Sequence, residues 1–111
     1  RTMNFQQILL ESALENYKRD LEQYLGDSNG SGVYDFPYHP NATAVVKKNY
    51  MGDFGYVIKV EVKKGKETVS AARVRKGGYV EYINGNGRKV EETSGLPDPP
   101  RLFGRLLDIM E

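Results

Sequence analysis

Basic side chains and one tyrosine share a face of the sheet predicted in the middle of the chain. In the strand register derived below, Tyr82 lies on that face among Lys59, Lys63, Arg73 and Arg75. Cationic groups neutralise phosphates and an aromatic ring offers a surface on which a base can stack, which is how single-stranded nucleic acids are bound. The alternative is a solvated face on which Arg73 stacks against Tyr82 and lysines protect the sheet edges.

A second candidate for chemistry is one carboxylate, Glu81. The same register turns Glu81 toward the concave side of the sheet, with Tyr56 and Tyr79. A carboxylate in an apolar pocket has a raised pKa and can act as a general base, which would make the domain a small-molecule pocket enzyme. The alternative is that Glu81 reaches water near the end of its strand or pairs with a neighbouring cation.

The sequence offers no recognisable catalytic or metal-binding motif. It has no nucleophile elbow, phosphate loop, dinucleotide fingerprint or zinc-ligand spacing, and it has no cysteine. The one histidine, His39, lies in a predicted loop between Tyr38 and Pro40 without further ligands at a metal-binding spacing. We therefore expect no catalytic residue, no metal site and no cofactor.

The centre of the predicted sheet is a hairpin. Apolar and polar residues alternate over 56–63, as in a strand with one buried face, and a second β-rich stretch follows over 68–75. A two-residue turn would place Arg73 on the core side, whereas a three-residue loop over 64–66 keeps it outside, so we expect the three-residue loop. The core face then carries Tyr56, Ile58, Val60, Val62, Ser70, Ala72 and Val74.

The turns fix the cross-strand partners that we expect. The three-residue loop sets Tyr56 opposite Val74 and Ile58 opposite Ala72. A two-residue turn at Gly77-Gly78 then pairs the next strand. Its expected pairs are Val74 with Glu81 and Ala72 with Ile83 on the core face, and Arg73 with Tyr82 and Arg75 with Val80 on the outer face.

One helix is predicted before the strands in the chain and another after them. An amphipathic helix is expected from Asn4, its cap, to Leu25, just before Gly26. A shorter helix is expected after Asp98, opened by Pro99-Pro100, with an apolar stripe of Leu102, Phe103, Leu106, Leu107 and Met110. Further strands are predicted over 42–51, 79–83 and 88–92, and the proline-containing stretch 33–40 is expected to be an ordered, irregular loop.

This order predicts an α+β fold: a long N-terminal helix packed on a four- to five-stranded antiparallel meander sheet, with a short C-terminal helix. In element order the chain resembles the cystatin-like group, in which a curled sheet wraps one helix. The resemblance implies an arrangement only, and we transfer no residue from it. We expect residues 1–3 to be a cloning remnant and the start of the chain, and residues 4–111 to form a single domain.

Some apolar residues of the first helix lie away from its main stripe. Phe5, Ile8 and Leu9 cannot face the same sheet as the rest of that helix, and the C-terminal helix also needs a cover. Packing these two surfaces on each other, within the monomer or between molecules, would bury both. The candidate association surface is Phe5, Ile8, Leu9, Leu102, Phe103 and Leu106.

Charge is unevenly distributed along the chain, although its net charge is only +1. Residues 42–90 hold eleven basic and four acidic side chains, whereas the segments before and after them are each acidic by three charges. No run approaches the roughly 20 apolar residues of a membrane span. A cytoplasmic location is favoured, and the glycosylation pattern at Asn41 would matter only in a secreted protein.

From these observations we expect a non-catalytic protein-interaction or assembly domain within a larger protein or complex. Its expected partner is another protein or a second copy of the chain. The first alternative is single-stranded nucleic-acid binding through the basic, tyrosine-bearing face. The second is a pocket enzyme with Glu81 as its base.

Overall fold

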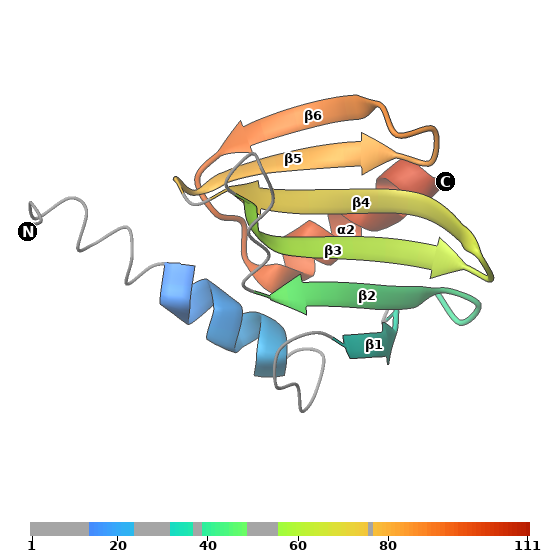
Figure 1. The fold of residues 1–111 in the computed structure, drawn as a ribbon, viewed down its shortest axis with the longest axis horizontal. Helices are drawn as coiled ribbons and strands as arrows, with labels where there is room; N and C mark the ends of the chain where they lie inside the picture. Colours follow the sequence, from blue (N-terminus) through green and yellow to red (C-terminus); the bar gives the residue numbers. More distant parts are fainter. Residues whose placement is uncertain (1–13, 24–31, 37–38, 49–55, 76) are drawn as a thin grey trace, which may run out of the picture.

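A computed structural model describes residues 14–23, 32–36, 39–48, 56–75 and 77–111. Within them the chain forms a helical segment at 14–23, a six-stranded antiparallel sheet and a C-terminal helix, so the α+β class is confirmed. The strands follow one another across the sheet in chain order (Figure 1). Their bounds, with that of the helix, are β1 Gly32–Asp35, β2 Thr43–Lys48, β3 Tyr56–Lys64, β4 Glu67–Arg75, β5 Tyr79–Asn84, β6 Lys89–Ser94 and α2 Pro99–Met110.

The expectation of four or five strands is wrong, because β1 forms in the stretch predicted to be an irregular loop. Val33 pairs with Val45 and Tyr34 with Ala44. The prolines that argued against a strand lie after β1, at 37 and 40, and so leave its backbone donors available for pairing. Phe36, just past the strand, is buried and donates its N–H to the Ala42 carbonyl at 3.0 Å.

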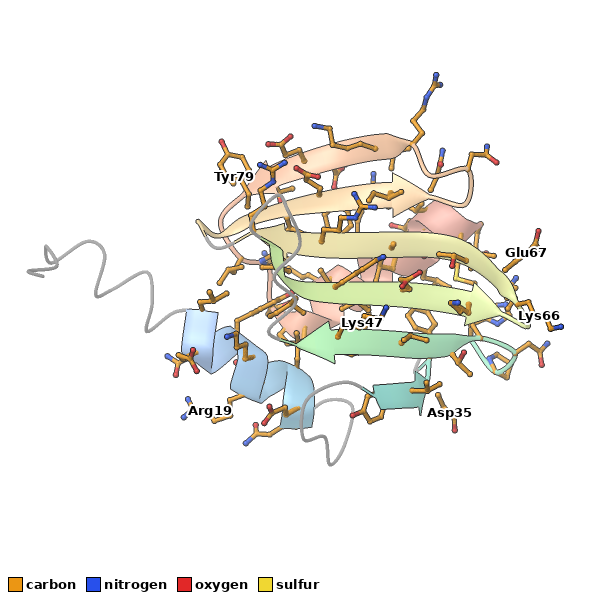
Figure 2. The ribbon with its side chains drawn as sticks, viewed as in Figure 1. Arg19, Asp35, Lys47, Lys66, Glu67 and Tyr79 are labelled. Carbon is orange, nitrogen blue, oxygen red and sulfur yellow. The ribbon has the colours of Figure 1, made fainter. Side chains whose placement is uncertain are left out.

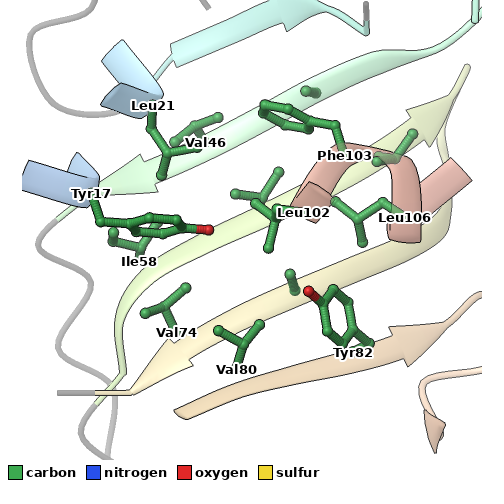
Figure 3. Close-up of a cluster of buried hydrophobic side chains, with 14 of the residues drawn as sticks. Tyr17, Leu21, Val46, Ile58, Val74, Val80, Tyr82, Leu102, Phe103 and Leu106 are labelled. Carbon is green, nitrogen blue, oxygen red and sulfur yellow. The ribbon is translucent and has the colours of Figure 1, made fainter. Parts of the chain in front are cut away.

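One face of the sheet carries the core, and both described helices pack on it (Figure 3). From α2, Leu102, Phe103 and Leu106 are fully buried, and the Phe103 ring meets Phe36 edge-on at 6.0 Å. The helical segment 14–23 buries residues three and four positions apart, the spacing of one helix face: Leu14, Tyr17 and Leu21.

The long N-terminal helix was expected to be the main cover of the sheet, and this is wrong. The structure describes that helix only over 14–23, and the rest of the span predicted from Asn4 to Leu25 lies outside the described residues. Instead, α2 packs across β4 and β5 in the middle of the sheet and lies behind it in Figure 1. The arrangement therefore differs from the single wrapped N-terminal helix that the cystatin-like element order implied.

The start of α2 follows the prediction. The Asp98 side chain accepts a hydrogen bond from the Arg101 backbone N–H at 3.0 Å, and Pro99 occupies the first helical position. Proline suits this position because its missing N–H would have no partner within the helix. No helix among the described residues is long and apolar enough to cross a membrane.

The hairpin of β3 and β4 keeps its predicted faces but not its predicted partners. Ile58 lies opposite Val74 rather than Ala72, a shift of two residues. The chain turns at Gly65-Lys66, with Gly65 at φ 64°, and Val69 forms a bulge beyond the turn. Because the shift is even, the predicted core residues stay inside: Ile58, Val60, Val62, Ser70, Ala72 and Val74 are buried. The side chain of Tyr56 lies outside the described part of the chain.

The pairing of β4 with β5 is shifted by one residue, so the faces predicted for β5 are wrong. Ala72 lies opposite Tyr82 instead of Ile83. The Gly78 N–H donates to the Arg75 carbonyl at 2.9 Å and Gly78 has φ 90°, so the connection is one residue longer than a two-residue turn. The odd shift turns Tyr82 into the core and Glu81 to the opposite face.

Candidate interaction face

Charged residues form a continuous line across the sheet on the face away from the core. The strand registers place each member directly opposite the next, from β2 to β6. We call this line the charge row: Lys47, Lys59, Arg73, Glu81 and Glu92. Neither described helix packs on this face, which we call the open face; Figure 2 views it from the front, with Lys47 labelled on β2.

The first half of the charge row holds three cations on neighbouring strands. Lys47 lies opposite Lys59, and Lys59 lies opposite Arg73. Like charges directly opposite each other destabilise a sheet, and the strands are only about 4.8 Å apart. Glu61 offsets part of this repulsion, because its carboxylate lies 3.4 Å from Lys59 Nζ and accepts a hydrogen bond from Thr68 Oγ1 at 3.2 Å.

The second half of the charge row is acidic and ion-paired. Glu81 is nearly buried, and its carboxylate lies 2.7 Å from Arg75 Nη2. Glu92 lies opposite Glu81 and 2.8 Å from Lys89 Nζ. The hydrogen bond from Lys89 lowers the pKa of Glu92, and the same bond raises the pKa of Lys89. The row thus changes sign between β4 and β5.

Apolar residues lie beside the charge row on the open face. Val33 on β1 lies opposite Val45, and Ala71 on β4 lies opposite Ile83 on β5. Val33 is 68% exposed, whereas Ala71 and Ile83 are nearly buried. Val33 is therefore accessible to another polypeptide, whereas Ala71 and Ile83 are not.

The predicted basic face forms in part. The register places Lys59, Lys63, Arg73 and Arg75 on the open face, as expected. Tyr82, the predicted aromatic centre of this face, lies instead in the core at 2% exposure, and burial raises its pKa to about 12. Its ring therefore offers no surface on which a base can stack.

The proposed surroundings of Glu81 are wrong for the same reason. The one-residue shift places Glu81 on the open face, where it pairs with Arg75, and not in a concave pocket. Tyr79 lies on the same side, 44% exposed. This arrangement satisfies the carboxylate with a guanidinium group and gives it no apolar pocket.

The predicted association surface does not remain accessible where the structure describes it. Leu102, Phe103 and Leu106 are fully buried between α2 and the sheet. The other three members, Phe5, Ile8 and Leu9, lie outside the described residues. The apolar stripe of α2 is thus explained by the core of the monomer, without a partner.

Polar contacts on the core side serve the fold. Arg105 of α2 binds both carboxylate oxygens of Glu91 on β6, with its Nε at 3.0 Å and its Nη2 at 2.9 Å. Two parallel bonds of this kind fix the orientation of the helix on the sheet. Burial raises the pKa of Tyr17, whose hydroxyl has no hydrogen-bond partner in the described part of the chain.

Two further features of the described residues bear on possible chemistry, His39 and a hollow beside β4 and β5. His39 lies in the turn before β2, where its Nδ1 accepts a hydrogen bond from the Asn41 backbone at 3.3 Å. No group of three or more metal-ligating side chains occurs within 14–23, 32–36, 39–48, 56–75 and 77–111. A hollow of about 360 Å³ lies between Glu67, Asn84 and Met110, but Asn84 Oδ1 already accepts bonds from two backbone donors of its own turn.

The sequence predicts Lys47 near the basic face, but it does not show that Lys47, Glu81 and Glu92 lie in one line with Arg73. Alternation along each strand shows which residues share a face, and it does not show which residues stand opposite each other. That information comes from the turns, whose lengths were predicted incorrectly. Comparisons of the chain with protein-family models, curated proteins and solved structures find no match.

Proposed function

We propose that this chain is a non-catalytic protein-interaction or assembly domain that binds a polypeptide on the open face of its sheet. One observation carries the proposal: Lys47, Lys59 and Arg73 stand directly opposite one another on a face that neither described helix covers. Two unit charges separated by about 5 Å, the spacing of neighbouring strands, repel in water by about 0.8 kcal/mol, and Glu61 offsets part of this repulsion at Lys59. Carboxylates of a partner would replace this repulsion with attraction of similar size.

A polypeptide suits the open face better than a nucleic acid. The charge row continues from the cations into Glu81 and Glu92, so a phosphate backbone following it would meet two carboxylates. Tyr82 is in the core, which removes the stacking surface on which the nucleic-acid alternative depended. A polypeptide can present acidic groups to one half of the row and basic groups to the other.

The direct experiment is an NMR titration of the ¹⁵N-labelled domain with a short polyglutamate peptide, and in parallel with an oligothymidylate of equal charge. The peptide is expected to shift the amide resonances of β2 to β4, and the shifts should weaken as salt is added. Lys47→Glu should weaken this binding. Lys66→Glu makes the same charge change in the exposed β3–β4 turn, away from the row, and serves as the matched control (Figure 2).

Two results would count against the proposal. Polyglutamate that shifts no open-face resonance at low salt would show that the cations do not form a binding surface. Oligothymidylate that binds more tightly than polyglutamate, with a steep dependence on salt, would favour the nucleic-acid alternative.

A further inference from the structure

The charges of the row are complementary in sign to those of the same row read in the opposite direction. Read from β2 to β6, its charges are three positive and then two negative: Lys47, Lys59, Arg73, Glu81 and Glu92. Suppose that a second copy of the row is placed over the first in the opposite direction, with the two Arg73 residues facing each other. Lys47 of one row then faces Glu92 of the other. Lys59 faces Glu81, which is again a pair of opposite sign. Arg73 is the only member of the row that faces a residue of the same charge.

From this order, and resting on the proposed function, we infer that the polypeptide bound by the open face is a second copy of this chain. The two copies would be related by a two-fold axis that runs parallel to β4 and passes Arg73. Lys47 of each copy then faces Glu92 of the other, and Lys59 faces Glu81. A two-fold dimer uses the same surface patch twice, so such a patch must be self-complementary.

Two directions of the two-fold axis would stack the open faces of two copies, and the charges favour one of them. An axis parallel to the row would place Lys47 on Lys47 and Glu92 on Glu92, which is repulsive at every position. The axis parallel to β4 brings Lys47 and Glu92 together at both ends of the row, which gives two attractive contacts between exposed side chains. Glu81 faces Lys59 but is buried and paired with Arg75 of its own chain, and Arg73 meets Arg73 at the axis. This axis also keeps the strands of the two sheets nearly parallel, which is the aligned class of sheet packing.

The dimensions are compatible with this contact. Five strands at about 4.8 Å spacing make a row about 19 Å long, and packed sheets lie about 10 Å apart. Extended side chains of Lys47 and Glu92 can meet across that gap.

The contacts at the ends of the row are the accessible ones. Lys47 is exposed, and the Glu92 side chain is 38% exposed. Because exposed ion pairs are individually weak and screened by salt, the expected dimer is weak and forms mainly at low ionic strength.

Sedimentation equilibrium over a range of protein concentrations tests the inference at ionic strengths of about 0.01 M and about 1 M, where the Debye length falls from roughly 30 Å to roughly 3 Å. The wild type should dimerise at low salt and dissociate at high salt. Lys47→Glu and Glu92→Lys should each weaken dimerisation by at least about tenfold, because each creates two like-charge contacts per dimer. Lys66→Glu should dimerise like the wild type.

Mixing the two single variants gives the sharpest result. In a mixed dimer, each changed residue faces a residue of opposite sign, so an equimolar mixture of Lys47→Glu and Glu92→Lys should dimerise although neither variant does so alone. The doubly substituted chain should dimerise with itself for the same reason. Restored association of this kind cannot come from a general loss of stability.

A wild type that remains monomeric at low salt overturns the inference, as does a dimer that Lys47→Glu leaves unchanged. The proposed function survives either result if polyglutamate still shifts the open-face resonances. If a variant fails to fold, the concentration dependence of the wild-type NMR spectrum decides. Shifts centred on the charge row are expected at high concentration, and their absence overturns the inference.

Discussion

Replacing Tyr82 by alanine should remove an aromatic ring from the centre of the core. The side chain lies on β5 opposite Ala72 and is 2% exposed, close to Leu102 and Leu106 of α2 (Figure 3). Truncating a buried aromatic residue removes its burial energy and leaves a cavity, which together cost about 3–5 kcal/mol. The same substitution on an exposed sheet face changes the free energy of unfolding by about 0.5 kcal/mol or less.

The chain supplies a matched control in Tyr79, three positions earlier on the same strand. Tyr79 is 44% exposed, so Tyr79→Ala should change stability far less than Tyr82→Ala. For a domain of this size, 1 kcal/mol shifts the melting temperature by several degrees, so Tyr82→Ala should lower Tm by roughly 10 °C or more. Urea unfolding followed by circular dichroism measures both variants and gives the free energies directly.

A small effect of Tyr82→Ala, with Tyr79→Ala costing as much or more, would refute the register of β4 with β5. Glu81 and Glu92 would then no longer lie in one row with Arg73, since the row depends on that register. The stability experiment is therefore also a test of the geometry from which the interaction face is built. It needs no partner and can be carried out first.

Two further predictions concern stability. Asp98→Ala should cost about 1 kcal/mol, because it removes the side-chain acceptor of the Arg101 N–H at the start of α2, whereas Asp98→Asn should retain most of that stability in the same urea experiment. Alkaline pH should destabilise the fold through Tyr82: its pKa is raised from 10.0 to about 12, so its contribution is complete below pH 10 and is lost as pH rises through 12. Unfolding at several pH values between 9 and 12 checks this. Tyr82→Phe should reduce the slope without removing it, because burial also raises the pKa of Tyr17. An unchanged slope in that variant would refute a contribution from Tyr82.

The sequence was sufficient to predict the fold class and the two faces of the central hairpin. Alternation from Tyr56 to Lys63 determines which residues face the same way, and the two-residue error in pairing with β4 left that unchanged. The same reasoning failed at β5, because Gly77 and Gly78 are compatible with both a two-residue and a three-residue connection. Local residue preferences do not decide between these, and a single residue exchanged the positions of Tyr82 and Glu81.

The helices show a second limit of sequence reasoning. An apolar stripe indicates that a helix is covered, and it does not identify the cover. Leu102, Phe103 and Leu106 were assigned to an association surface because the sheet already had one predicted helix, yet the sheet is broad enough for two. The apolar stripe of α2 was predicted correctly, but the surface that covers it was not. Whether the sheet can cover a second helix depends on the number of strands, which was underestimated by at least one.

The edges of the sheet give an independent reason to look for association on its face. An open sheet can also extend by pairing edge to edge with another chain, and natural edge strands carry features that prevent this. At one edge, β1 is only four residues long and ends in Asp35. At the other, β6 carries charges of both signs, including Lys89 and Glu92, and its pairing with β5 is interrupted by a bulge. Both edges thus have the properties that oppose strand addition, whereas the open face presents a row of charges whose order matches its own reversal. Pairing along β6 would bring a new strand beside Glu92 and leave Lys47 without a new contact, whereas pairing along β1 would leave Glu92 as it is. The charge-exchange variants therefore distinguish the two modes: association restored in their mixture requires the face, and association that Lys47→Glu leaves unchanged would point to an edge.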